Sequence, residues 1–232
     1  AVINSGAKVT TTEATTVDET ATEVTTGEAT EATTSNAAFA VNPPKADGAD
    51  VTFKDVPATH WANDAVSTLA KAGVVNGLSA DTFGTATNSK RGDFVVMLVR
   101  ALGIDSTSTT NFSDVDSSKY YAKAIATAKA YGIVNGYNDN TFKPENYITR
   151  QDMMILAKKA LVYKLGSDIT VENTDNLKGF SDYEDISAYA LESLSAMVKD
   201  GYVNGMDGNK IAPKATTTRV QAATVIYKIM NK

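Results

Sequence analysis

The feature that most constrains this chain is a segment that occurs three times after residue 50. Each copy begins with phenylalanine and, two residues later, aspartate; it then has a loop bounded by two glycines, and an arginine stands fourteen positions after the second glycine. The copies begin at Phe53, Phe112 and Phe180, their loops span residues 73–77, 132–136 and 201–205, and the arginines are Arg91, Arg150 and Arg219. Self-similarity of this kind indicates one supersecondary unit used three times.

The pattern within each copy predicts a helix, a loop and a second helix. In the first copy, apolar residues from Trp61 to Leu69 are spaced as on one helical face, and Gly73 stands where a left-handed C-terminal cap is expected. The second helix is expected to open at the arginine. Residues 149–152 and 218–221 have the form of a capping box, in which a threonine and a side chain three residues later satisfy exposed amides.

Two short helices cannot form a hydrophobic core alone, so the three copies are expected to pack on one another. We therefore predict a mainly α fold of three helix-loop-helix repeats, arranged as a single-chain pseudo-threefold trimer. The repeats are assigned to residues 51–104, 110–165 and 178–231, and residues 51–231 are expected to form one folded unit.

Residues 1–50 have a different composition, rich in threonine, glutamate and alanine. This segment holds two lysines and eight acidic residues, so its charge of minus six exceeds the net charge of −5 of the whole chain, and the repeats are close to neutral. We interpret it as a disordered, acidic linker. A neutral repeat region lacks the basic face that nucleic-acid binding needs, and the sequence has neither a cysteine nor an apolar run long enough to span a membrane.

With these residues in place, the repeat region resembles the S-layer homology domain. The match is clearest in the middle copy, where Asn135, Gly136 and Tyr137 lead to residues 142–144 and then to residues 148–152. The first copy departs from the family at residues 90–93, and the third at residues 206–208 and 220–221. The resemblance implies an extracellular protein at the bacterial cell wall or S-layer.

The resemblance also implies a ligand, namely secondary cell-wall polysaccharide linked to peptidoglycan, often carrying pyruvylated N-acetylmannosamine, held in grooves between adjacent motifs. We expect non-covalent anchoring of an exported protein, with no catalytic residue, cofactor or metal. The expected ligand-binding residues are Arg91, Arg150, Arg219, Trp61, Tyr120, Tyr189, Gly77, Gly136, Gly205, Lys90 and Asp152.

The arginines have a physical reason to bind an anion. A cation in the first turn of a helix is opposed by the helix dipole, at a cost of roughly 0.3 to 1 kcal/mol when exposed. A ligand carboxylate would meet the guanidinium group and free helix amides. Alternatively, each arginine pairs with the repeated Asp55, Asp114 or Asp182 and only holds the fold together. Both interpretations stay open at this point.

The remaining candidate residues also allow two interpretations. Trp61, Tyr120 and Tyr189 offer flat faces to a sugar ring, or they anchor the packing at the head of a helix. The three glycines permit a positive φ or close approach of a ligand, or they serve an ordinary turn.

Other functions have weaker support in the sequence. A protein-interaction or self-assembly module of a surface layer is the main alternative, and such a chain would have other surface-layer subunits as partners. A hydrolase built on carboxylates such as Asp93 and Asp152 is a further hypothesis. His60 is the only histidine, which leaves no choice of base for a catalytic triad and no histidine pair for a metal.

Deleting residues 1–45 is expected to leave wall binding and the midpoint of thermal unfolding nearly unchanged, because a linker contributes reach and not contacts. Melting curves and wall pull-downs of the full and shortened chains would check this. A large loss in either measurement would show that the segment belongs to the fold or to the binding site.

Overall fold

A computed structural model describes residues 51–232, and the predicted linker at residues 1–50 lies outside this part of the chain. The described residues form α-helices and short 3₁₀ turns, with isolated β-bridges but no extended strand. The α-helices are α1 (Asn63–Lys71), α2 (Arg91–Leu102), α3 (Ala122–Ala130), α4 (Arg150–Leu165), α5 (Leu191–Lys199) and α6 (Arg219–Met230). The 3₁₀ turns are η1 (Asp175–Leu177), just before the third copy, and η2 (Tyr183–Asp185) and η3 (Ala188–Ala190) within it.

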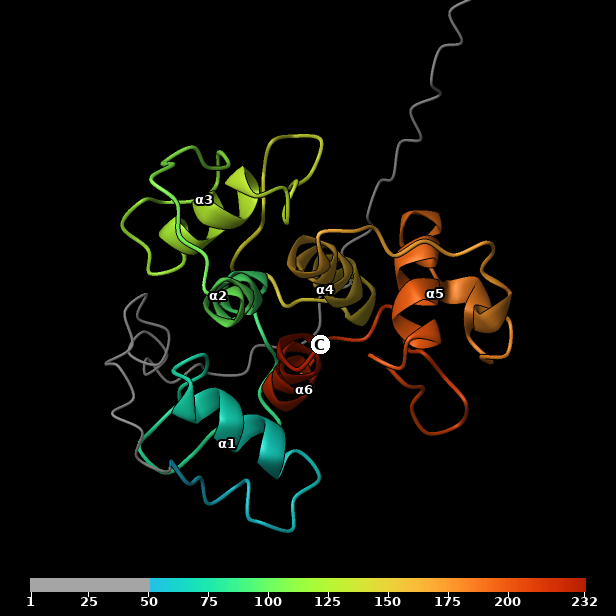
Figure 1. Cartoon of the computed structure of the whole chain (residues 1–232), viewed down its shortest axis with the longest axis horizontal. Helices are drawn as coiled ribbons and strands as arrows, with labels where there is room; N and C mark the ends of the chain where they lie inside the picture. The colour runs from blue at the N-terminus through green and yellow to red at the C-terminus, as the bar shows by residue number, and fades with distance from the viewer. Residues whose placement is uncertain (1–50) are drawn as a thin grey trace, which may run out of the picture. The chain divides into compact units, whose positions relative to one another are not determined.

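The second helices of the three copies lie together at the centre, and the first helices surround them (Figure 1). The central helices α2, α4 and α6 all contact one another. Each outer helix packs on the central helix of the preceding copy: α3 on α2, α5 on α4, and α1 on α6. The last of these contacts joins the first copy to the third, so the three copies close into a ring. This closed arrangement is consistent with the expected pseudo-threefold trimer.

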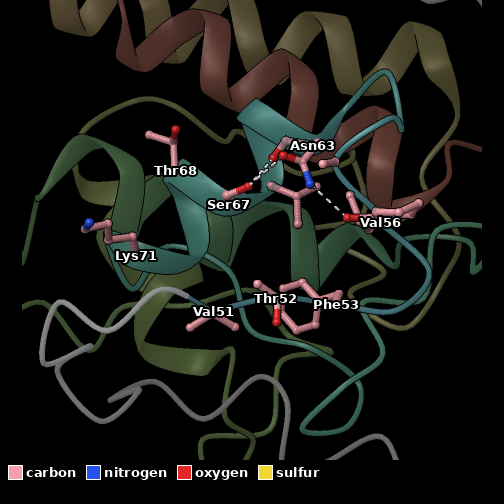
Figure 2. A pocket seen from close by; sticks show the side chains of 11 residues that line it. Val51, Thr52, Phe53, Val56, Asn63, Ser67, Thr68 and Lys71 are labelled. Atoms are coloured by element: carbon pink, nitrogen blue, oxygen red, sulfur yellow. Dashed lines mark hydrogen bonds between the residues drawn. The ribbon is translucent and has the colours of Figure 1, made fainter.

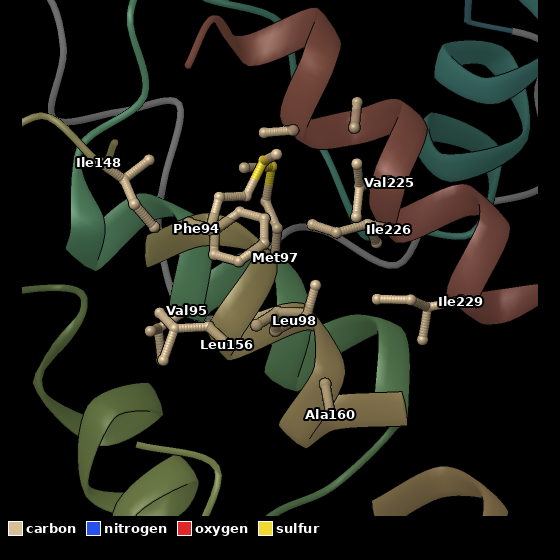
Figure 3. Packing of buried hydrophobic residues seen from close by; sticks show 14 of the residues in the cluster. Phe94, Val95, Met97, Leu98, Ile148, Leu156, Ala160, Val225, Ile226 and Ile229 are labelled. Atoms are coloured by element: carbon tan, nitrogen blue, oxygen red, sulfur yellow. The ribbon is translucent and has the colours of Figure 1, made fainter. Parts of the chain in front are cut away.

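The hydrophobic core lies where the three central helices meet. Figure 3 shows Phe94 and Leu98 of α2, Leu156 of α4, and Ile226 and Ile229 of α6 in this region. Four of them are wholly buried, and Leu156 keeps only 6% of its surface exposed. Because each central helix contributes to one shared core, no copy has a core of its own.

A ring of three backbone hydrogen bonds joins the copies just before the central helices begin. The amide of Ser89 donates to the carbonyl of Thr217 (2.8 Å), that of Thr217 to Ile148 (2.9 Å), and that of Ile148 back to Ser89 (2.9 Å). All three residues are fully buried. The same position of each copy therefore bonds the same position of another, and the chain meets itself around one axis.

The repeated aspartate of each copy closes the loop of its own copy. Asp55 accepts hydrogen bonds from the amides of Phe83, Gly84 and Thr85 at 2.7 to 3.0 Å. Asp114 and Asp182 do the same with two amides each, those of residues 142–143 and 211–212. A carboxylate that accepts hydrogen bonds from several amides holds a loop firmly in one conformation, because hydrogen bonds to a charged group are stronger than neutral ones. We call this arrangement a loop clamp.

The second glycine of each loop makes room for the phenylalanine that opens the copy. Gly136 has φ of +71°, a conformation that favours glycine, and a side-chain carbon there would collide with the ring of Phe112. At Gly77 and Gly205 the obstructing rings are those of Phe53 and Phe180. The structure thus accounts for these glycines by packing within the copy.

The helix boundaries agree closely with the sequence pattern. All three central helices begin at the repeated arginine, and Thr149 and Thr218 cap α4 and α6 as expected, the latter in a full capping box with Gln221. Gly73 follows α1 with φ of +69°. Trp61, in contrast, precedes α1, which begins at Asn63, so this aromatic residue lies in the turn before the helix.

Removing one copy should abolish cooperative folding, because every outer helix packs on a central helix that belongs to another copy. A chain of residues 108–232 would leave α3 without α2 and α6 without α1. We expect its thermal unfolding to be broad and its amides to exchange rapidly. The chain of residues 46–232 is the matched control. A sharp transition of the two-copy chain near the midpoint of that control would contradict the closed ring.

The loop clamp at Asp55 should make stability depend on pH. Partial burial raises the pKa of this carboxyl, but the hydrogen bonds from Phe83, Thr85 and Gly84 lower it more, so its pKa lies below the ordinary value of 3.8. The carboxylate therefore stabilises the fold above about pH 3.8, and this contribution disappears as the pH falls through its lowered pKa.

Asp55→Asn should accordingly lower the free energy of unfolding at pH 7 by about 1.5 kcal/mol, the lower end of the range for bonds to a charged group. The difference from the unaltered chain should shrink in acid. Urea unfolding at pH 7 and pH 3 would measure both values, with Glu172→Gln, at an exposed carboxylate, as the control. A difference that stays constant with pH would exclude this role of Asp55.

Candidate functional site

The three repeated arginines reach from one copy into the loop of the next. The Nε of Arg91 donates to the carbonyl of Phe142, that of Arg150 to Ile211, and that of Arg219 to Phe83, each at 3.0 Å. All three arginines are buried, with 1 to 7% of their surface exposed. The local geometry is the same three times because each arginine occupies the first position of a central helix.

The backbone of each helix start is also used by the neighbouring loop. The amide of Arg150 donates to the carbonyl of Ala215 (2.9 Å) and that of Gln151 to Pro213 (3.0 Å). The corresponding amides of α2 donate to Asn146 and Pro144. The expectation that a ligand would meet free helix amides is therefore wrong at these positions, since protein carbonyls already occupy them. These carbonyls and those that the arginine side chains contact also balance the positive charge at the helix start.

The suggested pairing of each arginine with a repeated aspartate is also not what the structure shows. Asp55, Asp114 and Asp182 accept from backbone amides of their own copy, and the arginine of the preceding copy donates to a carbonyl of the same loop. In the second copy, Phe142 is held at its amide by Asp114 and at its carbonyl by Arg91. The arginine does hold the fold together, but through the loop backbone.

Near Arg91 and near Arg219, an aromatic residue and the third residue of a central helix interact with each other, and these two residues and the arginine come from three different copies. The Arg91 cluster consists of Arg91, Asp152 and Tyr189; the Arg219 cluster of Arg219, Asp93 and Tyr120; and the Arg150 cluster, by equivalence of position, of Arg150, Gln221 and Trp61. These clusters contain most of the side chains that the sequence singles out.

In the Arg91 cluster, Asp152 joins the other two members. Its Oδ2 accepts from Nη1 of Arg91 (3.0 Å), and its Oδ1 accepts from the hydroxyl of Tyr189 (3.1 Å). Burial, and then the charge of Asp152 together with this hydrogen bond, raises the pKa of Tyr189 to about 12. The guanidinium group also lies over the rings of Tyr137 and Phe142, at 5.1 and 4.8 Å from their centroids.

In the Arg219 cluster, Asp93 is the corresponding acid. It accepts a short hydrogen bond from the hydroxyl of Tyr120, and 6% of its surface is exposed. Burial raises the pKa of Asp93, although the Tyr120 hydroxyl and the charge of Arg219 oppose this shift. Burial and the charge of Asp93 raise the pKa of Tyr120 in turn. Arg219 also lies over the ring of Phe83 (4.9 Å) and donates from Nη2 to the carbonyl of Asn76 (2.7 Å).

The Arg150 cluster differs in its chemistry. Its third helical residue is Gln221, whose side chain accepts from the amide of Thr218 (3.1 Å). Its aromatic member is Trp61, which has no hydroxyl and is 66% exposed, stacked beside His60 at 5.5 Å. Among the described residues, the guanidinium group of Arg150 donates only to the carbonyls of Ile211 (3.0 Å) and Asn204 (3.3 Å).

The other predicted site residues have structural partners. Lys90 forms an ion pair with Glu145 (3.1 Å), which also accepts from the hydroxyl of Tyr121 (2.7 Å). Gly77, Gly136 and Gly205 lie against phenylalanine rings of their own copies and not beside the arginines. Of the aromatic residues, Trp61 and Tyr189 are exposed at 66% and 58%, whereas Tyr120 is partly buried.

Two residues of the clusters, Asp93 and Gln221, are not among the ligand-binding residues expected from sequence, although Asp93 is a candidate in the hydrolase hypothesis. A signal for them exists, because both stand two positions after a repeated arginine, as does Asp152. The repeated asparagines Asn76 and Asn204 also belong to the site, through backbone carbonyls that accept from arginine. A backbone contact leaves no trace in the residue type, so this part of the site has no sequence signal.

A cavity of about 420 Å³ lies along α1 (Figure 2), and no member of the arginine clusters lines it. Its lining is mainly apolar and hydroxyl side chains, such as Val51, Phe53 and Thr68, together with Asn63 and Lys71. Asn63 at the start of α1 donates to the carbonyl of Val56 (2.8 Å) at its edge. None of the expected ligand-binding residues lines this cavity.

Within residues 51–232, no helix is both long and apolar enough to cross a bilayer. The same residues contain no group of three or more histidine, cysteine or acidic side chains arranged to hold a metal ion.

Comparison with known proteins matches the S-layer homology domain to residues 52–95, 111–154 and 179–223, one match in each copy. Three relatives illustrate the range of proteins that contain similar sequence. They are an amylopullulanase from Thermoanaerobacterium thermosulfurigenes (35% identical), the exoglucanase XynX from Acetivibrio thermocellus (32%) and an S-layer protein from Bacillus thuringiensis subsp. finitimus (32%). The alignments cover 79%, 78% and 76% of this chain but only 10%, 16% and 21% of the respective relatives.

Among solved structures, the undecaheme cytochrome from the S-layer of Carboxydothermus ferrireducens is similar over 63% of this chain and 18% of its own, at 16% identity and a TM-score of 0.39. The sequence matches carry the assignment. The domain occurs in S-layer proteins and in enzymes of the cell surface, and this locates the chain outside the cell, at the bacterial cell wall or S-layer. With its motif matched in all three tandem copies, the chain belongs to the S-layer homology domain family.

Proposed function

We propose that this chain anchors an exported protein to the cell wall by non-covalent binding of an anionic secondary cell-wall polysaccharide at the arginine clusters between the copies. Pyruvylated N-acetylmannosamine is the sugar that we assign to the polymer. The three repeats, at residues 51–104, 110–165 and 178–231, act together as one binding unit. The repeat region itself has no catalytic role in this proposal.

The observation that carries the proposal is the repeated combination of a guanidinium group with an aromatic side chain. Arginine suits a carboxylate because its planar group offers paired donors. An exposed aromatic face such as that of Trp61 or Tyr189 suits the apolar face of a sugar ring. A charged polysaccharide offers both chemistries in one repeating unit.

A repeating polymer also suits a protein with repeated sites. When several modest sites hold one chain, the second contact is effectively intramolecular, and overall binding can increase by about 10² to 10⁴. Anchoring then needs no single tight site. It needs sites that are held rigidly apart, which the closed ring of central helices provides.

The relatives support an anchoring role for a small part of a longer protein. This chain spans only 10 to 21% of the length of the three relatives described above, and two of them are named as polysaccharide-degrading enzymes. We therefore infer that the chain holds a larger activity at the cell surface. Self-assembly in a surface layer is the second candidate, because other relatives are S-layer proteins.

Binding to purified cell walls tests the proposal. The chain should bind native walls and should bind poorly to walls stripped of secondary polysaccharide. Trp61→Ala should weaken binding of a short polymer fragment about 2- to 12-fold, which corresponds to roughly 0.5 to 1.5 kcal/mol for one aromatic face. Its thermal midpoint should change little, because Trp61 is largely exposed.

Leu165→Ala is the matched control, since this residue is also exposed (43%) but ends α4, at the opposite end from the helix start. It should bind like the unaltered chain. Equal binding to native and stripped walls would instead favour protein contacts and the self-assembly alternative. Loss of affinity in both variants alike would remove Trp61 from the site.

A further inference from the structure

The three clusters share one geometry but differ in charge at one position. The third residue of the central helix is Asp93 in α2, Asp152 in α4 and Gln221 in α6. Two clusters therefore contain a carboxylate of the protein and the third contains a neutral amide. The Nε of every repeated arginine makes the same bond to a loop carbonyl, so the charge at this third position is what changes the balance of charge from cluster to cluster.

In the Arg91 cluster the balance is direct. Asp152 lies 3.0 Å from Nη1 of Arg91, where a ligand carboxylate would otherwise bind. In the Arg219 cluster, Asp93 is buried beside Tyr120, and its charge is close enough to stabilise the protonated form of Arg219. Asp152 contacts its arginine directly, and Asp93 supplies a negative charge near Arg219.

The Arg150 cluster lacks such an acid. Among the described residues Arg150 forms no ion pair, and its Nη1 donates to no atom. It also lacks the rings that lie under the other guanidinium groups, because Met206 and Ile211 stand where the second copy has Tyr137 and Phe142. Burial lowers the pKa of Arg150, and only the more distant charge of Asp182 opposes this.

A buried cation with so little compensation is costly unless something anionic approaches it. The cost is tolerated here because two backbone carbonyls hold the group in place, at 3.0 and 3.3 Å. These bonds hold Nε and Nη2 of the guanidinium group in place. The N–H groups of Nη1, and the second N–H of Nη2, can then donate to a ligand. Trp61, at the equivalent of the tyrosine position, contributes an exposed ring with no hydroxyl to bind an acid.

We propose that the Arg150 cluster is the one site of the three that selects a carboxylate-bearing sugar, and that Asp152 and Asp93 act as built-in carboxylates that close the other two clusters to anions. This inference rests on the proposed function and specifies which cluster binds the negatively charged group of the polymer. Gln221 is the residue that determines this specificity. The other two clusters then contribute only neutral sugar contacts.

The test introduces the missing acid. Gln221→Asp copies the residue of the other clusters into the third, and the probe is N-acetylmannosamine carrying a pyruvate ketal, with its methyl ester as a neutral counterpart. Calorimetry of the unaltered chain should give one site for the acid form and at least tenfold weaker binding of the ester. Gln221→Asp should lose at least tenfold in affinity for the acid form and much less for the ester.

Two further variants show whether an effect of Gln221→Asp comes from its charge at this position, from its shorter side chain, or from the change in net charge of the protein. Gln221→Asn shortens the side chain without adding charge, so its loss should be smaller than that of Gln221→Asp. Asn231→Asp adds the same charge at the exposed far end of α6 and should bind like the unaltered chain. Melting curves would verify that all three variants fold. Asp152→Asn should create a second site for the acid form, because it releases Nη1 of Arg91.

The possible outcomes are distinct. Two or three equal sites in the unaltered chain, or unchanged affinity in Gln221→Asp, would overturn the assignment while leaving wall anchoring intact. Absence of any binding of the acid probe would overturn it as well. Failure of the proposed function would appear differently, as equal binding of the unaltered chain to native and polysaccharide-stripped walls.

Discussion

The bond from the arginine of one copy to the loop of the next is the interaction on which the rest of this structure depends. It is made three times with the same 3.0 Å distance from Nε to a loop carbonyl, and the third bond returns to the first copy. A buried guanidinium group is expensive to desolvate, and it is tolerated only where carbonyl or carboxylate oxygens receive its protons. The loop supplies those oxygens, and the repeated aspartate fixes the loop. Each copy is therefore complete only when its neighbour is present.

The same dependence explains the arrangement of the helices. An outer helix of nine residues is too short to persist alone, and in this fold it packs on the central helix of the preceding copy. The sequence predicts both helices of each copy and even the residue at which the central ones begin. It does not predict which helices are partners, because apolar periodicity marks the buried face of a helix but carries no information about what covers that face.

For the candidate site, too, the sequence predicts the residues but not their partners. The arginines at Arg91, Arg150 and Arg219 stand out because the repeat region has only one other arginine, and the structure brings each into a cluster between copies. Their partners could not be foreseen. Asp114 was a plausible partner for an arginine on charge alone, yet it accepts from the amides of residues 142–143, while the arginine contacts the carbonyl side of the same loop. Contacts to the backbone depend on the path of the chain and not on residue type, and sequence patterns do not report them.

A fold with three equivalent positions can still carry unequal sites, and the third residue of each central helix shows how. Capping requires little of this residue: the amide of Asp152 bonds to the hydroxyl of Thr149, and Gln221 completes a reciprocal capping box with Thr218. Acid and amide both satisfy the start of the helix, so the fold tolerates either one. The charge at this position can therefore differ between copies without loss of the cap. Because the position lies beside a buried arginine, one substitution changes the electrostatics of one cluster and leaves the closed ring of helices as it was.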